Sequence, residues 1–143
     1  MAYNTNTSIS NGTKIRCLQI NLQHSRAATG NLQNFVHQCG IDIIFAQEPY
    51  VINNKVAGMS HHYKIITQGN GKIRAAIIIT NRNHDALLIR KLSDEDKELV
   101  EFTDRNLFAL SAYFDIDYHQ SQKNGQRSSV YSRKCTSNFS GQQ

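Results

Sequence analysis

The stretch Ile41-Asp42-Ile43-Ile44-Phe45-Ala46-Gln47-Glu48-Pro49-Tyr50 decides the fold that the sequence predicts. Its apolar run has the length and the β-branched and aromatic content of a strand that is buried on both faces. Pro49, the only proline of the chain, has no backbone N–H to give to a sheet and therefore marks the strand's end. Glu48 thus comes at the carboxyl end, where ligands of open α/β sheets collect. A carboxylate there is a candidate ligand for Mg²⁺, and a solvated glutamate at a strand end is the alternative.

The residues before this stretch predict a second strand and a helix. Residues 15–22 read as a mostly apolar strand with Asn21 at its end. Four apolar residues then recur with the i, i+3, i+4, i+7 spacing of one helical face, namely Leu32, Phe35, Val36 and Cys39. We expect Thr29 or Asn31 to cap the start of this helix and Gly40 to end it.

Strand, helix and strand in this order predict a βαβ unit with two parallel strands and a right-handed crossover. Both strands would then end at one edge of the sheet, with Asn21 beside Glu48. An amide that hydrogen-bonds a phosphate oxygen or a metal-bound water, next to a metal-binding carboxylate, suits phosphoester chemistry. Two unrelated polar residues that end two strands are the simpler interpretation.

Residues 51–118 predict short antiparallel strands. Tyr63–Thr67 and Ala75–Thr80 flank a turn rich in Gly and Asn, which predicts a hairpin. Further strands are expected over 86–92, 99–103 and 107–114, as an antiparallel meander. We expect the acidic run 94–98 to be a solvated turn, because it lacks the spaced oxygens and the glycine of a calcium-binding loop.

Length and composition predict one domain with two polar ends. The 143 residues are enough for a core, but a hydrophobic content of 39% and a mean hydropathy of −0.50 suggest that part of the chain is unstructured. We expect a disordered leader over 1–14, a folded domain over 15–118 and a disordered basic tail over 119–143. The pI near 9.2 is by itself a weak argument for a nucleic-acid partner, because the basic excess gathers in that tail.

The three cysteines are odd in number and form no C-x-x-C pair, which argues against a disulfide framework or a zinc site and favours reduced, intracellular thiols. The sequence shows no signal-peptide pattern and no apolar run of about 18 residues. We therefore expect an intracellular protein, nuclear or cytoplasmic, with no membrane partner.

Two segments resemble the first two motifs of the endonuclease/exonuclease/phosphatase superfamily, Cys17-Leu18-Gln19-Ile20-Asn21-Leu22-Gln23-His24-Ser25-Arg26-Ala27-Ala28 and Ile43-Ile44-Phe45-Ala46-Gln47-Glu48-Pro49-Tyr50. More narrowly, they are similar to the apurinic-type endonuclease domain at the N-terminus of non-LTR (LINE-like) retrotransposon polyproteins. Residues 71–79 resemble the third conserved stretch of that group, and residues 110–114 resemble the strand that bears its active-site tyrosine. In this order the motifs are fairly specific, although each alone is weak. The resemblance covers about residues 15–118 and implies the N-terminal half of an α/β sandwich, truncated.

The resemblance also implies a reaction, the metal-assisted hydrolysis of a DNA phosphodiester that primes reverse transcription. Asn21 and Glu48 would hold Mg²⁺ or Mn²⁺ and the scissile phosphate, and Tyr113 would approach that phosphate. Arg74 would contact phosphate or DNA. The implied partners are DNA and, in the parent polyprotein, the retrotransposon RNA and reverse transcriptase.

The chain also departs from the family's pattern. Asp115 stands where the family usually has proline, and the later Asp-x-Asn and Asp-His motifs have no counterpart in residues 119–143. Asp115, Asp117 and His119 could share one face of a strand as a substitute, although an exposed strand edge is the simpler interpretation. We therefore expect a partial endonuclease domain that is inactive as this chain.

Two alternatives stay open at this point. One is a catalytically dead remnant that binds nucleic acid weakly through Arg74, Arg82 and the basic tail. The other is an unrelated small α/β binding domain, in which Asn21 and Glu48 would lie far apart. Half of a sandwich should also expose an apolar sheet face, which we expect to include some of Ile77, Ile79, Leu88, Leu110 and Ala112.

Overall fold

The computed structural model describes residues 14–69 and 71–115. The predicted basic tail, with His119, lies outside these residues, as do Asp117 and all of the predicted leader except Lys14. Along the chain the elements are β1 (Cys17–Asn21), α1 (Arg26–Cys39), β2 (Ile43–Gln47), β3 (Val51–Ile52), β4 (Lys55–Val56), β5 (Lys64–Ile66), β6 (Ala75–Ile79), β7 (Leu87–Leu88), the 3₁₀ helix η1 (Arg90–Leu92), β8 (Lys97–Phe102) and β9 (Leu107–Ala112).

The strands form a four-stranded main sheet, a three-stranded second sheet and a small hairpin. The main sheet has the order β1-β2-β6-β5, the second sheet has the order β7-β8-β9, and β3 pairs only with β4. β1 and β2 are parallel and joined by α1, while β6 runs antiparallel to both β2 and β5. The predicted βαβ unit and hairpin are therefore confirmed, and the fold is mixed α/β. The predicted meander is confirmed as β7-β8-β9, but the strand expected over 86–92 is only partly so, because Arg90–Leu92 form η1.

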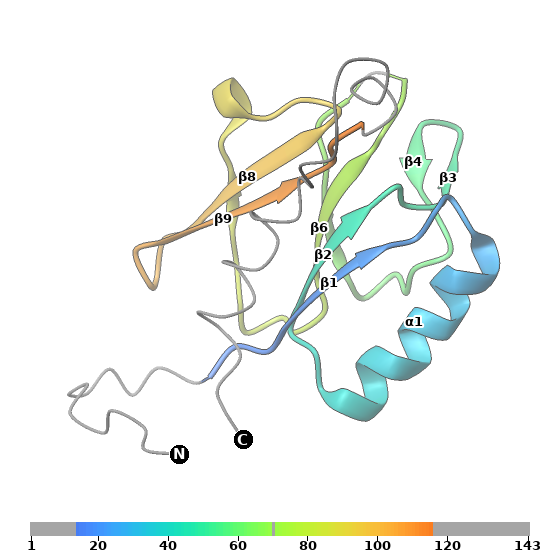
Figure 1. Ribbon diagram of the computed structural model, residues 1–143. Coiled ribbons are helices and arrows are strands. Elements are labelled where there is room, and N and C mark those ends of the chain that lie inside the picture. The colour runs from blue at the N-terminus through green and yellow to red at the C-terminus, as the bar shows by residue number, and fades with distance from the viewer. Residues whose placement is uncertain (1–13, 70, 116–143) are drawn as a thin grey trace, which may run out of the picture.

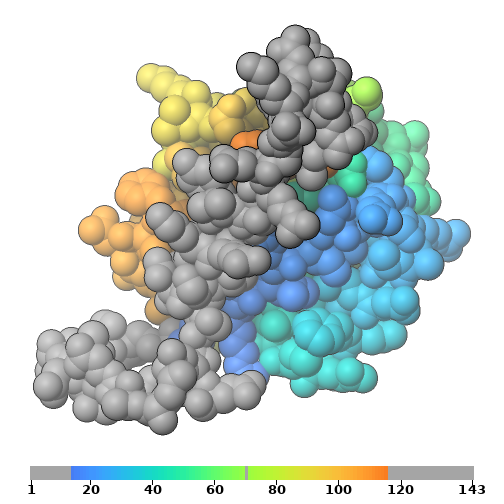
Figure 2. All heavy atoms as spheres, viewed as in Figure 1, coloured from blue at the N-terminus to red at the C-terminus, as the bar shows by residue number. Residues whose placement is uncertain are grey.

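The helix and the two larger sheets form three layers. Figure 1 shows α1 on one side of the main sheet and β8 and β9 on the other. Figure 2, in the same view, shows the segment from β1 to β2 and the second sheet on opposite sides of the described surface. Because the main sheet is covered twice, all five residues of β2 and all five of β6 are buried.

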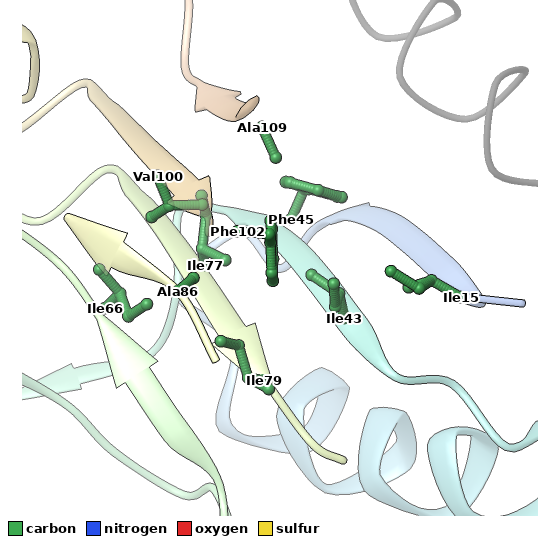
Figure 3. Close-up of a cluster of buried hydrophobic side chains, with 10 residues drawn as sticks. All are labelled: Ile15, Ile43, Phe45, Ile66, Ile77, Ile79, Ala86, Val100, Phe102 and Ala109. Carbon is green, nitrogen blue, oxygen red and sulfur yellow. The ribbon is translucent and has the colours of Figure 1, made fainter. Parts of the chain in front are cut away.

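Each face of the main sheet carries its own core. Between the two sheets, the buried side chains include Phe45 of β2, Ile77 of β6 and Phe102 of β8 (Figure 3). Under the helix, Leu32 and Val36 pack with other buried residues of the opposite face. Neighbouring residues of a strand point to opposite faces, so the unbroken apolar run of β2 feeds both cores.

The expected exposed face is only partly confirmed. Ile77 and Ile79 are 0% and 2% exposed, because the second sheet covers the face on which we expected them to be uncovered. Large exposed side chains lie one layer further out, on the second sheet, where Leu87, Phe108 and Leu110 are 57%, 54% and 38% exposed. The described residues thus already contain both sheets of a sandwich.

The helix starts earlier than the sequence predicted. Its N-cap is Ser25, whose Oγ accepts a hydrogen bond from the Ala28 N–H at 3.1 Å, so the proposed caps Thr29 and Asn31 are wrong. The predicted end is confirmed, since Gly40 adopts the left-handed conformation at φ 61°. Across residues 14–69 and 71–115, no helix combines the length and apolar character needed to cross a membrane.

Candidate active site

The ends of β1 and β2 meet at one edge of the main sheet. Asn21 is the register partner of Gln47, so Glu48 follows directly beside the end of β1. Two backbone hydrogen bonds continue this pairing past the strands, from Leu22 N–H to the Gln47 carbonyl at 2.9 Å and from His24 N–H to the Glu48 carbonyl at 2.8 Å. The expected adjacency of the two strand ends is confirmed, and this counts against an unrelated fold.

The backbone at this edge is unusual. Gln23, His24 and Glu48 have φ angles of 49°, 54° and 45°, a left-handed region that non-glycine residues seldom occupy. Such conformations cost free energy and gather at functional sites. Asn21 helps to hold the turn, because its Oδ1 accepts a hydrogen bond from the Gln23 N–H at 2.8 Å.

An open pocket of about 400 Å³ lies at this edge. Its lining residues come from β3 and from loops that adjoin strands of both larger sheets, namely His24, Glu48, Val51, Gly71, Lys72, Ile73, Arg74 and Tyr113. Three of the four predicted site residues thus come together: Glu48, Arg74 and Tyr113. Asn21 is exposed beside the pocket but does not line it, and its role toward metal or phosphate stays a prediction.

Tyr113 reaches the pocket from the end of the second sheet. Its backbone N–H donates to the Asp96 carbonyl at 2.7 Å, and its hydroxyl hydrogen-bonds to Glu48. Burial raises the pKa of the Tyr113 phenol above its usual value, and the negative charges of Glu48 and Asp115 add to the effect, while the positive charge of Arg74 opposes it. The phenol is therefore protonated at neutral pH and can act as a hydrogen-bond donor.

Arg74 joins the two sheets next to this tyrosine. Its guanidinium donates two hydrogen bonds to the Asp96 carboxylate, from Nε to Oδ1 and from Nη2 to Oδ2, the second at 2.9 Å. Nη2 also lies 3.5 Å from Glu95 Oε1, and Nη1 lies 3.9 Å from Asp115 Oδ2. The hydrogen bonds to Asp96 are the main reason that the pKa of Arg74 is raised.

The same guanidinium packs over the Tyr113 ring, with Cζ 5.4 Å from the ring centroid. The backbone of Arg74 supports the other strand end, because its carbonyl accepts from the Glu48 N–H at 2.8 Å. Arg74 therefore positions Glu48 and Tyr113, and the phosphate or DNA contact expected of it stays a prediction.

The sequence did not single out His24 or Asp96 as site residues. His24 Nδ1 lies 3.0 Å from the Pro49 carbonyl oxygen, and His24 Nε2 lies 3.9 Å from Glu48 Oε1. The polar run that follows the first strand could have pointed to His24. Asp96 belongs to the acidic run predicted as a solvated turn, and nothing in the local sequence shows that its partner is Arg74.

The oxygen and nitrogen donors at this edge fit a divalent metal that keeps part of its water shell. In the described part of the chain, no three residues of the types His, Cys, Asp and Glu gather closely enough to form a complete metal cage. Mg²⁺ and Mn²⁺ sites in phosphoryl-transfer enzymes commonly have one or two protein ligands, with water and phosphate oxygens as the rest. Glu48, with His24 and Asn21 next to it, matches such an open site.

Comparison with known proteins supports the same architecture. No protein-family model matches the chain, and no curated protein sequence matches it at a significant level. The chain is similar to the solved structure of the endonuclease domain of TRAS1, a telomere-specific non-LTR retrotransposon, with a TM-score of 0.60 and 24% sequence identity. The similarity covers 76% of this chain and 50% of that one, so the chain spans half the length of that domain. It shows that the chain has the endonuclease-like α/β fold that the sequence predicted.

Proposed function

We propose that this chain carries the metal-binding and phosphate-binding part of an endonuclease domain that hydrolyses DNA phosphodiester bonds, of the kind found in non-LTR retrotransposons. The observation that carries the proposal is the meeting of Glu48 and Tyr113, which follow strands of different sheets, in one pocket at the carboxyl edge of β1 and β2. The fold likeness to the endonuclease domain of TRAS1 supports it.

Each residue of the edge has a role in this proposal. Glu48 is the carboxylate that holds Mg²⁺ or Mn²⁺, and Asn21 offers its amide to a phosphate oxygen or a metal-bound water. When bound, the metal supplies positive charge that stabilises the developing charge on the phosphate and the leaving oxygen. Tyr113, whose hydroxyl hydrogen-bonds to Glu48 in the structure, turns this hydrogen bond toward the phosphate once Glu48 holds the metal. Lys72 at the exposed rim attracts the DNA backbone.

A second candidate, a remnant that binds nucleic acid through Arg74 and Arg82, has less support. The charge of Arg74 is matched by Glu95, Asp96 and Asp115. Arg82 Nε lies 3.4 Å from the carbonyl oxygen of His62 and does not line the pocket. The attraction of a phosphate to the pocket therefore rests more on a metal at Glu48 and on Lys72 than on either arginine.

The proposal is tested by metal-dependent DNA binding. The affinity of the full chain for a short fluorescent DNA duplex is measured by anisotropy, with Mg²⁺ and with EDTA. We expect Mg²⁺ to strengthen binding and Glu48→Gln to remove that gain. Glu101→Gln is the matched control, because Glu101 pairs with Phe108 on the second sheet and does not line the pocket. An equal gain from Mg²⁺ in wild type and Glu48→Gln would contradict the proposal.

Turnover by the 143-residue chain is a separate question. We expect no nicking of supercoiled plasmid above that of Glu48→Ala, in Mg²⁺ or in Mn²⁺. The sequence offers no counterpart of the Asp-x-Asn and Asp-His motifs. General acid–base help is worth about 10²–10⁴-fold in rate, and one preorganised stabilising donor about 10²–10³-fold. Metal-dependent nicking that disappears in Glu48→Ala would show that the chain builds a complete site.

A further inference from the structure

We propose that His24 is a second protein ligand of the metal at Glu48, so that the site presents one nitrogen and one carboxylate and favours Mn²⁺ over Mg²⁺. This inference rests on the proposed function, because it concerns the same metal site. It gives the site a metal preference, which neither the sequence motifs nor the fold likeness supplies.

The hydrogen bond at Nδ1 of His24 determines whether Nε2 of the same ring can bind a metal. His24 Nδ1 lies 3.0 Å from the Pro49 carbonyl oxygen, which can only accept, so Nδ1 carries a proton. In the neutral ring, Nε2 then has a free lone pair. Histidines that bind metals almost always donate their other ring N–H to a carbonyl or a carboxylate in this way.

The distance between His24 Nε2 and the Glu48 carboxylate leaves room for an ion. Nε2 lies 3.9 Å from Glu48 Oε1, which is too far for a direct hydrogen bond. Two ligand atoms that each lie about 2.1 Å from one ion, at ordinary coordination angles, are roughly 3.0–3.4 Å apart. Side-chain rotations that close the gap by less than about 1 Å would complete the geometry. Both side chains are accessible, at 54% exposed for His24 and 22% for Glu48.

Backbone hydrogen bonds hold the His24 ring next to the Glu48 carboxylate. The His24 N–H donates to the Glu48 carbonyl at 2.8 Å, and the next residue closes the turn through Ser25 N–H to the Leu22 carbonyl at 2.8 Å. His24 and Glu48 both have left-handed backbones, which the local hydrogen bonds stabilise against their intrinsic cost. The two donors therefore face each other before any ion arrives.

The nitrogen donor has a consequence for metal choice. Mg²⁺ takes oxygen ligands almost exclusively, whereas imidazole nitrogen is a good ligand for first-row transition metals. A site of one imidazole and one carboxylate should bind Mn²⁺ more tightly than Mg²⁺. The competing arrangement is an ion pair between a His24 imidazolium and Glu48, in which Nε2 carries a proton and cannot bind a metal.

The experiment is pulsed electron paramagnetic resonance of Mn²⁺ bound to the full chain, with Mn²⁺ and Mg²⁺ affinities measured by calorimetry. Nitrogen modulation from a bound imidazole is expected in wild type and should be lost in His24→Asn. Asparagine suits this test because it tolerates a left-handed backbone and has no imidazole. We expect His24→Asn to weaken Mn²⁺ binding by about tenfold or more and Mg²⁺ binding by less than about threefold. His37→Asn, at an exposed position of α1, should match wild type.

The outcomes separate this inference from the proposed function. Mn²⁺ binding that needs Glu48 but shows no nitrogen modulation in wild type would overturn the role of His24 and leave the metal site in place. Absence of Mn²⁺ binding in wild type, or binding that Glu48→Gln does not weaken, would overturn both. If His24→Asn fails to fold, the presence or absence of nitrogen modulation in the wild-type spectrum still shows whether His24 binds Mn²⁺.

Discussion

The two larger sheets differ in how many of their faces are covered. In the main sheet, β2 and β6 are buried at every position, whereas β8 of the second sheet alternates between buried and more exposed residues. A strand covered on both faces has room for polar chemistry only at its ends. The main sheet therefore places Glu48 at its carboxyl edge. The second sheet contributes Tyr113, which follows β9, to the same pocket, and Asp96, which precedes β8, binds the pocket residue Arg74.

The strongest test of this contrast compares two phenylalanines of the second sheet. Phe102 points into the core between the sheets and is 0% exposed, while Phe108 lies on the outer face and is 54% exposed. We expect Phe102→Ala to lower the free energy of unfolding by about 3–5 kcal/mol. Phe108→Ala should cost about 1 kcal/mol or less. Urea denaturation measures both, and equal losses would mean that the outer face is covered as well.

Glu98 is an exception to the apolar inner face of β8. It lies on the same face as Val100 and is fully buried, and its Oε1 accepts a hydrogen bond from the Gln68 N–H. Its Oε2 has no hydrogen-bond partner among the residues that the structure describes. Burial raises the pKa of this carboxyl from 4.5 to about 7, against the opposing effect of the Gln68 hydrogen bond.

This raised pKa makes stability depend on pH. The folded state holds the Glu98 proton more tightly than the unfolded state, so its contribution is complete below pH 4.5 and is lost as pH rises through about 7. The full loss is at most roughly 3 kcal/mol. We expect Glu98→Gln to be more stable than wild type by about 1–3 kcal/mol near pH 8, and the difference to shrink below about pH 5. Denaturant unfolding as a function of pH measures it, and a Gln variant that is destabilised at every pH would contradict the pKa.

A smaller loss of stability is expected from removing the ion pairs of Arg74, which join the two larger sheets. Asp96→Asn removes the paired hydrogen bonds to Arg74, but both side chains are partly exposed, at 41% and 24%, so the cost should be about 1 kcal/mol or less. Glu95→Gln, which touches the same guanidinium with a single contact at 3.5 Å, should change stability by under about 0.5 kcal/mol. By NMR, the chemical shifts of the Tyr113 ring protons should change in Asp96→Asn and stay unchanged in Glu95→Gln. Equal shifts would mean that Asp96 does not position the ring.

Much of the fold followed from local sequence patterns. The apolar residues within 15–22 predicted β1, the helical spacing from Leu32 to Cys39 with Gly40 predicted α1, and the apolar run before Glu48 predicted β2, because each signal is local. The early start of α1 was missed because its first turn contains no large apolar residue to set the helical period. The β3–β4 hairpin was missed as well, although Asn53 and Asn54 adopt the positive φ that a tight turn requires.

The division into two sheets could not be predicted in the same way. A meander pattern does not show that β5 and β6 join the main sheet while β7, β8 and β9 form another, because that choice depends on contacts far apart in the chain. The prediction of a solvated turn over 94–98 was wrong for the same reason, because Asp96 binds Arg74 and Glu98 lies buried in the core. Tertiary partners decide whether a charged residue is solvated.

The central claim is that the carboxyl edge of β1 and β2 is a metal site built on Glu48. The most direct test is amide NMR line broadening by substoichiometric Mn²⁺. We expect broadening centred on the amides of residues 22–24, 48, 50 and 71–74 in wild type and in Glu101→Gln, and its disappearance in Glu48→Gln. Broadening centred on the acidic residues 94–96, or at the same edge but unchanged in Glu48→Gln, would contradict the claim.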